Sequence, residues 1–130
     1  MSDQELIDAA LAVREKAYCP FSGFYVGAAL LDDQGQMHIG CNVENSSYPQ
    51  GNCAETSAIG AMIAAGGKKI VTIAVAGGRE KVTACTPCGG CRQRIAEFAD
   101  AQTRIIVIDD DSDWHTYTMS ELLPARFHLS

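Results

Sequence analysis

Basic residues are scarce in this sequence, with 10 lysines and arginines against 16 aspartates and glutamates. The formal net charge of −6 leaves no positive surface to attract a polyanion, so binding to nucleic acid or to an anionic membrane is disfavoured. No apolar run approaches the roughly 18 residues that span a bilayer, and the first residues are acidic where a signal peptide would be basic. We therefore expect a cytoplasmic protein with a small ligand that is uncharged or cationic.

Internal repeats and low-complexity segments are also absent. The 130 residues are enough for one domain with a proper core and too few for two of ordinary size, so we expect a single domain over residues 1–130. Cysteine is plentiful by contrast, with six residues at positions 19, 41, 53, 85, 88 and 91. In a reducing compartment these are better explained as thiols or metal ligands than as a disulfide framework.

The predicted elements follow the order strand, strand, helix, strand, helix, strand after an N-terminal helix. That first helix begins at a Ser2–Glu5 capping box and its pattern stops at Pro20. The other predicted elements are a hairpin of residues 26–31 and 37–43, a helix from Cys53 to Gly66-Gly67, a buried strand at 70–76, a helix at 91–99, a buried strand at 104–109 and an edge strand at 116–119. This order predicts an α/β sandwich in which crossover helices join the later strands. The acidic tract 109–113 lacks the glycine and glutamate of a calcium loop and is predicted to be a solvated loop.

Two cysteines, Cys88 and Cys91, surround the start of a predicted helix. Taken alone, a CxxC motif is also compatible with a redox pair. Cys53 opens the preceding helix in the same way, so three sulfurs can converge where two helix N-termini meet. Three protein ligands leave the fourth position of tetrahedral zinc to water, as a catalytic site requires. Glu55, one turn away, can then accept a proton from water and deliver it elsewhere.

Cys85 leaves a second interpretation open, because CTPCGGC contains two overlapping CxxC pairs. Four ligands at Cys53, Cys85, Cys88 and Cys91 would close the site to water, and the chain would then be a zinc-stabilised binding protein. Cys85 precedes Pro87 in an extended approach to the helix, so we expect it to be a bystander. Glu55 would in the closed case only stabilise the first turn of its helix.

A ligand followed by Ala and Glu, and later by Pro-Cys-x-x-Cys, matches the zinc-deaminase signature in its three-cysteine form. The blocks AYCPFSGFYVGAALL, GCNVENSSY, NCAE, PCGGCRQ and ELLPARF together resemble the small homotetrameric cytidine deaminases over nearly the whole chain. The resemblance implies hydrolytic deamination of cytidine and deoxycytidine to uridine and deoxyuridine in pyrimidine salvage, with release of ammonia and one Zn²⁺ per chain. It also implies a three-layer α/β/α sandwich with a mixed sheet of about five strands.

The same resemblance assigns roles to individual residues. Cys53, Cys88 and Cys91 would hold the zinc, and Glu55 would move protons. The implied substrate contacts are Phe24 against the base, Asn42 and Glu44 on the ribose, the backbone of Ala54 on the pyrimidine edge, and Tyr48 and Phe127 reaching into a neighbouring subunit's site.

From the residues alone, these substrate positions have ordinary alternatives. Both phenylalanines could be core, Asn42 and Glu44 could be turn or strand-edge residues, and Tyr48 could brace its loop. Asn42 and Glu44 are two residues apart, so in an extended segment their side chains would share one face and could address one sugar hydroxyl.

Thr56 departs from the family pattern, in which many three-cysteine members place an arginine after the glutamate to offset the anionic metal centre. Arg79, Lys81 and Arg92 are the nearby cations in sequence that are candidates to replace it. A deaminase of a modified or antibiotic nucleoside such as blasticidin S would share the zinc site without the ribose contacts, and it remains the alternative enzyme.

Overall fold

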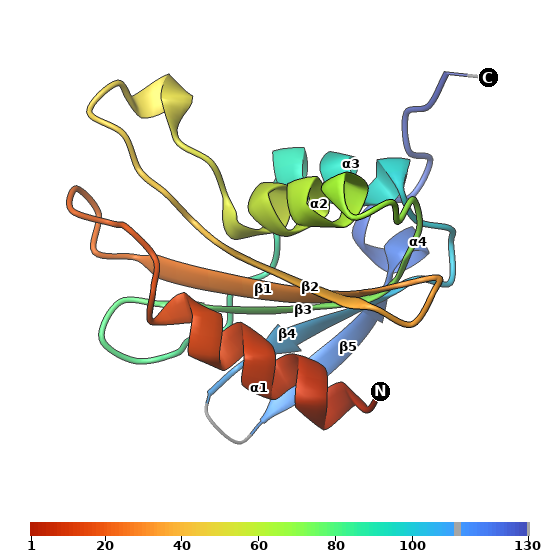
Figure 1. Cartoon of the computed structure of the whole chain (residues 1–130), viewed down its shortest axis with the longest axis horizontal. Helices are drawn as coiled ribbons and strands as arrows, with labels where there is room; N and C mark the ends of the chain where they lie inside the picture. The colour runs from red at the N-terminus through yellow and green to blue at the C-terminus, as the bar shows by residue number, and fades with distance from the viewer. Residues whose placement is uncertain (111–112, 130) are drawn as a thin grey trace.

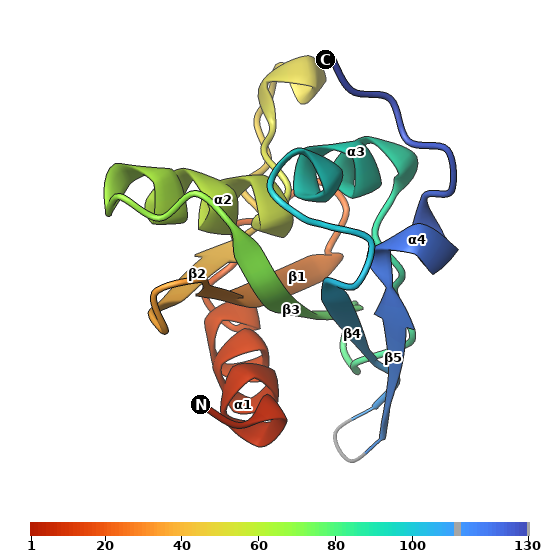
Figure 2. The same ribbon diagram turned by 90° about the vertical axis from the view of Figure 1, so that its right-hand side faces the viewer.

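A computed structural model describes residues 1–110 and 113–129 of the chain. Its elements are α1 (Asp3–Arg14), β1 (Tyr25–Asp32), β2 (Met37–Cys41), the 3-10 helix η1 (Tyr48–Gln50), α2 (Ala54–Ala64), β3 (Ile70–Gly78), α3 (Gly89–Glu97), β4 (Arg104–Ile108), β5 (Trp114–Thr118) and α4 (Met119–Leu122). A five-stranded sheet in the order β2-β1-β3-β4-β5 forms the middle layer. Helix α1 covers one face of it, and α2 and α3 lie on the other (Figures 1 and 2). The predicted three-layer α/β/α sandwich is confirmed.

The sheet is mixed, as predicted. Strands β1 and β2 form the antiparallel hairpin, and β3 and β4 run parallel because α3 crosses over between them. Strand β5 is antiparallel to β4 and lies at the edge. The apolar run of β3 is buried along almost its whole length, because helices cover both faces of the central strand.

Strand β2 and helix α1 both end earlier than their sequence patterns predict. Strand β2 stops at Cys41, because at the next residue the side-chain oxygen of Asn42 accepts the N–H of Val26 at 2.8 Å and takes the place of a backbone carbonyl. Val43 then bridges instead to Tyr18 and Asn52. Helix α1 ends at Arg14, well before Pro20, because the next residues form tighter turns that lead into this bridge.

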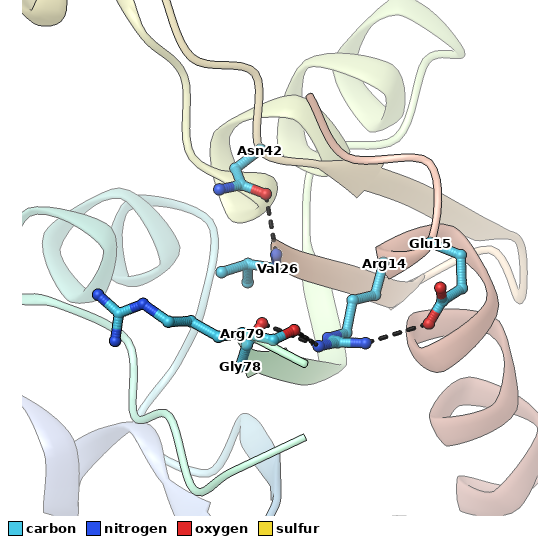
Figure 3. A network of polar contacts seen from close by, with 6 residues as sticks. All are labelled: Arg14, Glu15, Val26, Asn42, Gly78 and Arg79. Atoms are coloured by element: carbon cyan, nitrogen blue, oxygen red, sulfur yellow. Dashed lines mark hydrogen bonds and ion pairs between the residues drawn. The ribbon is translucent and has the colours of Figure 1, made fainter. Parts of the chain in front are cut away.

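Arg14 ties the end of α1 to the end of β3 (Figure 3). Its side chain is 5% exposed, and its Nη2 donates to the carbonyl oxygens of Gly78 at 2.8 Å and Arg79 at 2.7 Å. The other terminal nitrogen donates to Glu15 Oε1 at 3.1 Å. These bonds hold the start of the loop that carries the chain from β3 to the N-terminus of α3.

The acidic tract 109–113 includes residues 111 and 112, so the prediction that it is a solvated loop lies partly outside the described residues. Within residues 1–110 and 113–129, no helix combines the length and apolar character needed to cross a membrane.

Candidate active site at two helix N-termini

Both cysteines predicted to start helices occupy N-cap positions. Cys53 is the N-cap of α2 and Cys88 is the N-cap of α3, and the two helices pack side by side on one face of the sheet (Figures 1 and 2). The sulfur of Cys88 accepts the backbone N–H of Cys91 at 3.4 Å, which places Cys91 in the first turn of α3. The positive ends of two helix dipoles therefore point toward the cysteine sulfurs.

The tightest group of ionisable atoms consists of Cys53, Glu55 and Cys91. Their sulfurs and carboxylate oxygen lie within 4.8 Å of one another, and the two sulfurs are 2.9 Å apart. Cys91 is 2% exposed and Glu55 is 4% exposed. Cys88 is exposed and stands outside this tight group. Cys53 is only partly buried. Three ionisable groups gathered this closely, two of them buried, are costly to ionise without a compensating cation, which indicates a metal site.

The pKa values of the three groups in this cluster are shifted in different directions. A hydrogen bond from the Cys91 thiol, supported by Thr56, lowers the pKa of Cys53 to about 5. The same hydrogen bond, together with burial, raises the pKa of Cys91. Burial also raises the pKa of Glu55 to about 7, with the nearby Cys53 adding to the effect. A carboxyl group with a pKa near neutrality is well suited to accept and release a proton at physiological pH.

Cys85 is not part of the tight group, although it lies close enough to Glu55 and Cys88 to interact with them electrostatically. A Cβ atom on Gly77 would lie 2.9 Å from the Cβ and Sγ of Cys85 and 3.3 Å from the ring of Phe24. Only glycine at this position of β3 therefore lets the side chains of Cys85 and Phe24 pack directly against the strand. Burial raises the pKa of the Cys85 thiol, and the nearby carboxylate of Glu55 raises it further. The Cys85 side chain packs against Gly77 of β3, and we expect it to stay outside the set of metal ligands.

A serine at position 85 tests this interpretation. Cys85→Ser should keep close to the zinc content and activity of the parent protein, whereas Cys88→Ser should lose most of both, because thiolates rather than hydroxyls bind zinc well. Metal content of the purified variants, measured with equal protein concentrations, makes the comparison. Equal loss of zinc in the two variants would support the closed four-cysteine site instead.

Asn42 and Glu44 both face the segment between Pro20 and Val26. Besides accepting from Val26, the Asn42 amide donates to Phe24 O at 2.9 Å. Glu44 accepts the N–H groups of Phe21 and Ser22 at 2.9 and 3.1 Å and the Ser22 hydroxyl at 2.5 Å, and the Ser22 bond is the main reason that its pKa is lowered. The two side chains share one side, as the spacing predicted, and both hold the loop that carries Phe24.

A pocket of about 320 Å³ opens beside Glu44. Its lining consists of Phe21, Ser22, Glu44, Asn45, Tyr48 and Gly51. The ring of Tyr48 meets that of Phe21 edge to face, with centroids 5.7 Å apart. Two of the predicted substrate residues, Glu44 and Tyr48, therefore line the same pocket.

The predicted subunit-crossing residues are exposed in the isolated chain. Tyr48 is 74% exposed and Phe127 is 68% exposed, although Gln93 donates to the backbone oxygen of Phe127 at 3.1 Å. Ala54 behaves differently, since it is fully buried at the start of α2, next to Cys53. Within one chain, therefore, Tyr48 and Phe127 leave large apolar surfaces uncovered.

The sequence reasoning named Thr56 only as the replacement of an arginine and did not name Arg94, yet both residues act on the cysteine cluster. The hydroxyl of Thr56 lies 2.8 Å from Cys53 Sγ. The positive charge of Arg94 adds to the hydrogen bonds that lower the pKa of Cys53, and it partly opposes the burial that raises the pKa of Glu55. Helical spacing could have found them, because each follows a cysteine by three residues.

The cations named from sequence proximity have other partners. Arg92 donates to the backbone oxygens of Pro87 and Leu122 at 2.8 and 2.9 Å. Arg79 lies 5.9 Å from the ring centre of Phe24, and Lys81 lines a pocket beside α1. Position along the chain was thus a poor guide to which cation approaches the sulfurs.

Residues 1–108 match the family described as the cytidine and deoxycytidylate deaminase zinc-binding region. The chain belongs to this deaminase family. A cytidine deaminase of Halalkalibacterium halodurans is 42% identical over 127 residues, which cover 98% of this chain and 95% of that protein. A solved cytidine deaminase structure from Burkholderia pseudomallei is 40% identical and superposes with a TM-score of 0.89, covering 98% of this chain and 100% of that chain. A solved cytidine deaminase structure from Mycobacterium tuberculosis is 35% identical and superposes with a TM-score of 0.84, covering 99% of this chain and 100% of that chain. The predicted family and fold are confirmed.

The zinc of this family fits the donor set. Thiolate sulfur is a preferred zinc ligand, and the sulfurs of Cys53 and Cys91 already meet at the ends of two helices. Zn²⁺ with three thiolates is a net anion, which helix N-termini stabilise. The carboxylate of Glu55 lies inside the same cluster and is not needed as a fourth protein ligand.

Proposed function

We propose that this protein is a zinc-dependent cytidine deaminase that hydrolyses cytidine and deoxycytidine to uridine and deoxyuridine and releases ammonia. The observation that carries the proposal is the convergence of two cysteine sulfurs and a buried glutamate at the N-termini of α2 and α3. Relatives named cytidine deaminase that align with almost the full chain support the same activity. We infer a role in pyrimidine salvage in the cytoplasm.

In this proposal Cys53, Cys88 and Cys91 would hold one zinc ion per chain. When bound, zinc supplies a Lewis acid that makes water a better nucleophile near neutral pH. Cys88 is the exposed member of the set, and its sulfur is oriented by the N–H of Cys91.

Glu55 would carry protons during the reaction. It takes a proton from the attacking water and gives it to N3 of the pyrimidine, which makes C4 more electrophilic. It then takes the proton of the new C4 hydroxyl group and delivers it to the amino group. The C4–N bond breaks, ammonia leaves and the C4 carbonyl of uridine remains. In the metal-free protein, burial raises the pKa of Glu55 to about 7, so this carboxyl group can both accept and release a proton near neutral pH.

The remaining side chains would position the nucleoside. Phe24 would pack against the base, the backbone of Ala54 would bond the pyrimidine edge, and Asn42 and Glu44 would bind the sugar. Support comes from the contacts that Asn42 and Glu44 make with the loop of Phe24, because these contacts fix base-binding and sugar-binding groups relative to one another.

A deamination assay tests the proposed function. Zinc-loaded protein should consume cytidine and deoxycytidine, as measured by the change in ultraviolet absorbance and by ammonia release. Preferential use of blasticidin S would favour the antibiotic-nucleoside alternative. A protein that binds zinc but turns over none of these substrates would fit a non-catalytic zinc-stabilised binding protein.

We further propose a homotetramer in which each active site is completed by a neighbouring subunit. The large exposed rings of Tyr48 and Phe127 support it, because aromatic side chains are enriched at the centres of protein interfaces. No nucleic acid or membrane partner is proposed, consistent with the net charge of −6.

Deleting residues 127–130 should weaken substrate binding more than folding. We expect the KM for cytidine to rise about tenfold, which corresponds to the loss of one good aromatic contact. Circular dichroism should be unchanged, because Phe127 is largely exposed in the single chain. Steady-state kinetics and sedimentation velocity provide the measurements. A parent protein that sediments as a fully active monomer would rule out shared sites.

A further inference from the structure

The electric charge of the proposed centre poses a physical problem. One zinc ion with three thiolates carries a net charge of −1, and an ionised Glu55 in the same buried cluster adds another negative charge. The helix dipoles contribute only partial positive charges. A full positive charge close to the sulfurs would stabilise the loaded site further.

Arg94 reaches the first turn of α3 from within the same helix. It follows Gly90 by four residues, so the two positions share one helix face, and long side chains on a helix lean toward its N-terminus. A Cβ atom on Gly90 would lie 3.1 Å from Arg94 Nη1 and 4.0 Å from Cys88 Sγ. The guanidinium of Arg94 and the sulfur of Cys88 therefore both border the space that a side chain at position 90 would occupy. Because Gly90 has no side chain, the Arg94 guanidinium can lie there.

Thr56 acts on another ligand. Its hydroxyl lies 2.8 Å from Cys53 Sγ and donates to that sulfur when the cysteine is a thiolate. Cys53 and Cys88 are thus approached from different helices, one by a neutral donor and the other by a cation.

We propose that Arg94, seated over Gly90, stabilises the zinc–thiolate centre from the Cys88 side, while Thr56 stabilises it from the Cys53 side. The inference rests on the proposed function, because it takes Cys53, Cys88 and Cys91 as zinc ligands. Arg94 is a positioning residue that touches no reacting atom. Its guanidinium supplies a positive charge to the centre, which the neutral Thr56 does not.

A purely structural role for Arg94 makes a different prediction. A cation in the last turn of α3 would also stabilise the helix through its dipole. Substitution of Gly90 by alanine separates the helix-stabilising role from the charge-stabilising role. Alanine is the better helix former, and its methyl group would be in ordinary contact with Cys88 Sγ. Gly90→Ala should therefore leave the ligand in place and favour the helix, yet crowd Arg94 away from the sulfur.

The test is zinc affinity, measured by competition with a chromogenic chelator at low and high salt. Arg94→Met should weaken zinc binding about fivefold to tenfold at low salt and less at high salt, since the interaction is a screened charge attraction. Gly90→Ala should weaken it severalfold, and the double variant should bind no worse than Arg94→Met alone. Arg94→Lys should recover part of the affinity.

Lys68→Met serves as the matched control, because it removes an exposed positive charge from the turn between α2 and β3. It should leave zinc affinity unchanged. Parental zinc affinity in Arg94→Met would overturn the inference, as would fully additive losses in the double variant. Failure of the parent protein to bind zinc would instead overturn the proposed function, and this inference with it.

Discussion

Glu55→Gln should keep the fold and its zinc and should lose at least ~10⁴-fold in kcat for cytidine. Glutamine has nearly the same shape as glutamate but cannot accept and release the proton. General acid–base catalysis is commonly worth ~10²–10⁴-fold, and a residue that acts in two successive transfers belongs at the upper end of that range or beyond. Glu55 is buried beside Cys53 and Cys91, so bulk water cannot readily replace it.

Stability of the zinc-free variant offers an independent check. Burial raises the pKa of Glu55 to about 7 in the folded, metal-free protein, above that of the unfolded chain. The folded state binds this proton more tightly than the unfolded state does. The contribution of Glu55 to the free energy of unfolding is therefore lost as pH rises toward and through 7. Metal-free Glu55→Gln should thus be at least as stable at pH 8 as the metal-free parent, which thermal unfolding can measure.

Glu97→Gln is a suitable control for the activity measurement, because Glu97 is exposed at the end of α3. It should retain the parental kcat. Substantial turnover by a zinc-replete Glu55→Gln protein would remove Glu55 from the proposed mechanism. Loss of zinc from that variant would mean that the carboxylate is a metal ligand rather than a proton carrier.

Free cytosine should be deaminated with a kcat/KM at least about 10⁴-fold below that of cytidine. In the proposed binding mode Asn42 and Glu44 bond the sugar in addition to their contacts within the chain, and free cytosine would lose those sugar bonds. We expect both side chains to bond the 3′-hydroxyl, which ribose and deoxyribose share. Cytidine and deoxycytidine should therefore have similar kcat/KM values.

Cytidine monophosphate should also be a poor substrate, since its phosphate would approach the negative charge of Glu44. A side-by-side kcat/KM comparison of the four compounds makes the measurement. Glu44→Gln should lower the preference for cytidine over its monophosphate. Ser22→Ala, which removes a hydroxyl bonded to Glu44 but leaves the carboxylate, should largely retain it. Cytosine turning over as well as cytidine would contradict the nucleoside assignment.

Much of the local structure was predictable because short-range interactions decide it. Ser2 caps the first helix, and Gly66, with a φ of 98°, follows the end of α2 as its position in the sequence predicted. Cys53 and Cys88 occupy the N-caps of α2 and α3, where the sequence pattern placed them. The order of apolar runs was sufficient for the α/β class, since a strand covered on both faces must be apolar along its length.

The candidate site itself depends on how the two helices pack against the sheet. Cys53 and Cys91 are 38 residues apart in sequence, and their sulfurs come within 2.9 Å only because the crossover places α3 beside α2. The raised pKa of Glu55 comes mainly from burial, which a local motif does not encode. Sequence proximity pointed to Arg79, Lys81 and Arg92, whereas Arg94 approaches the sulfurs because of the helical turn and the missing side chain of Gly90. The sequence alone determined which residues cap helices and form strands, because those preferences act over a few residues. Distances, burial and charge contacts between elements were decided by the tertiary packing that brings those elements together.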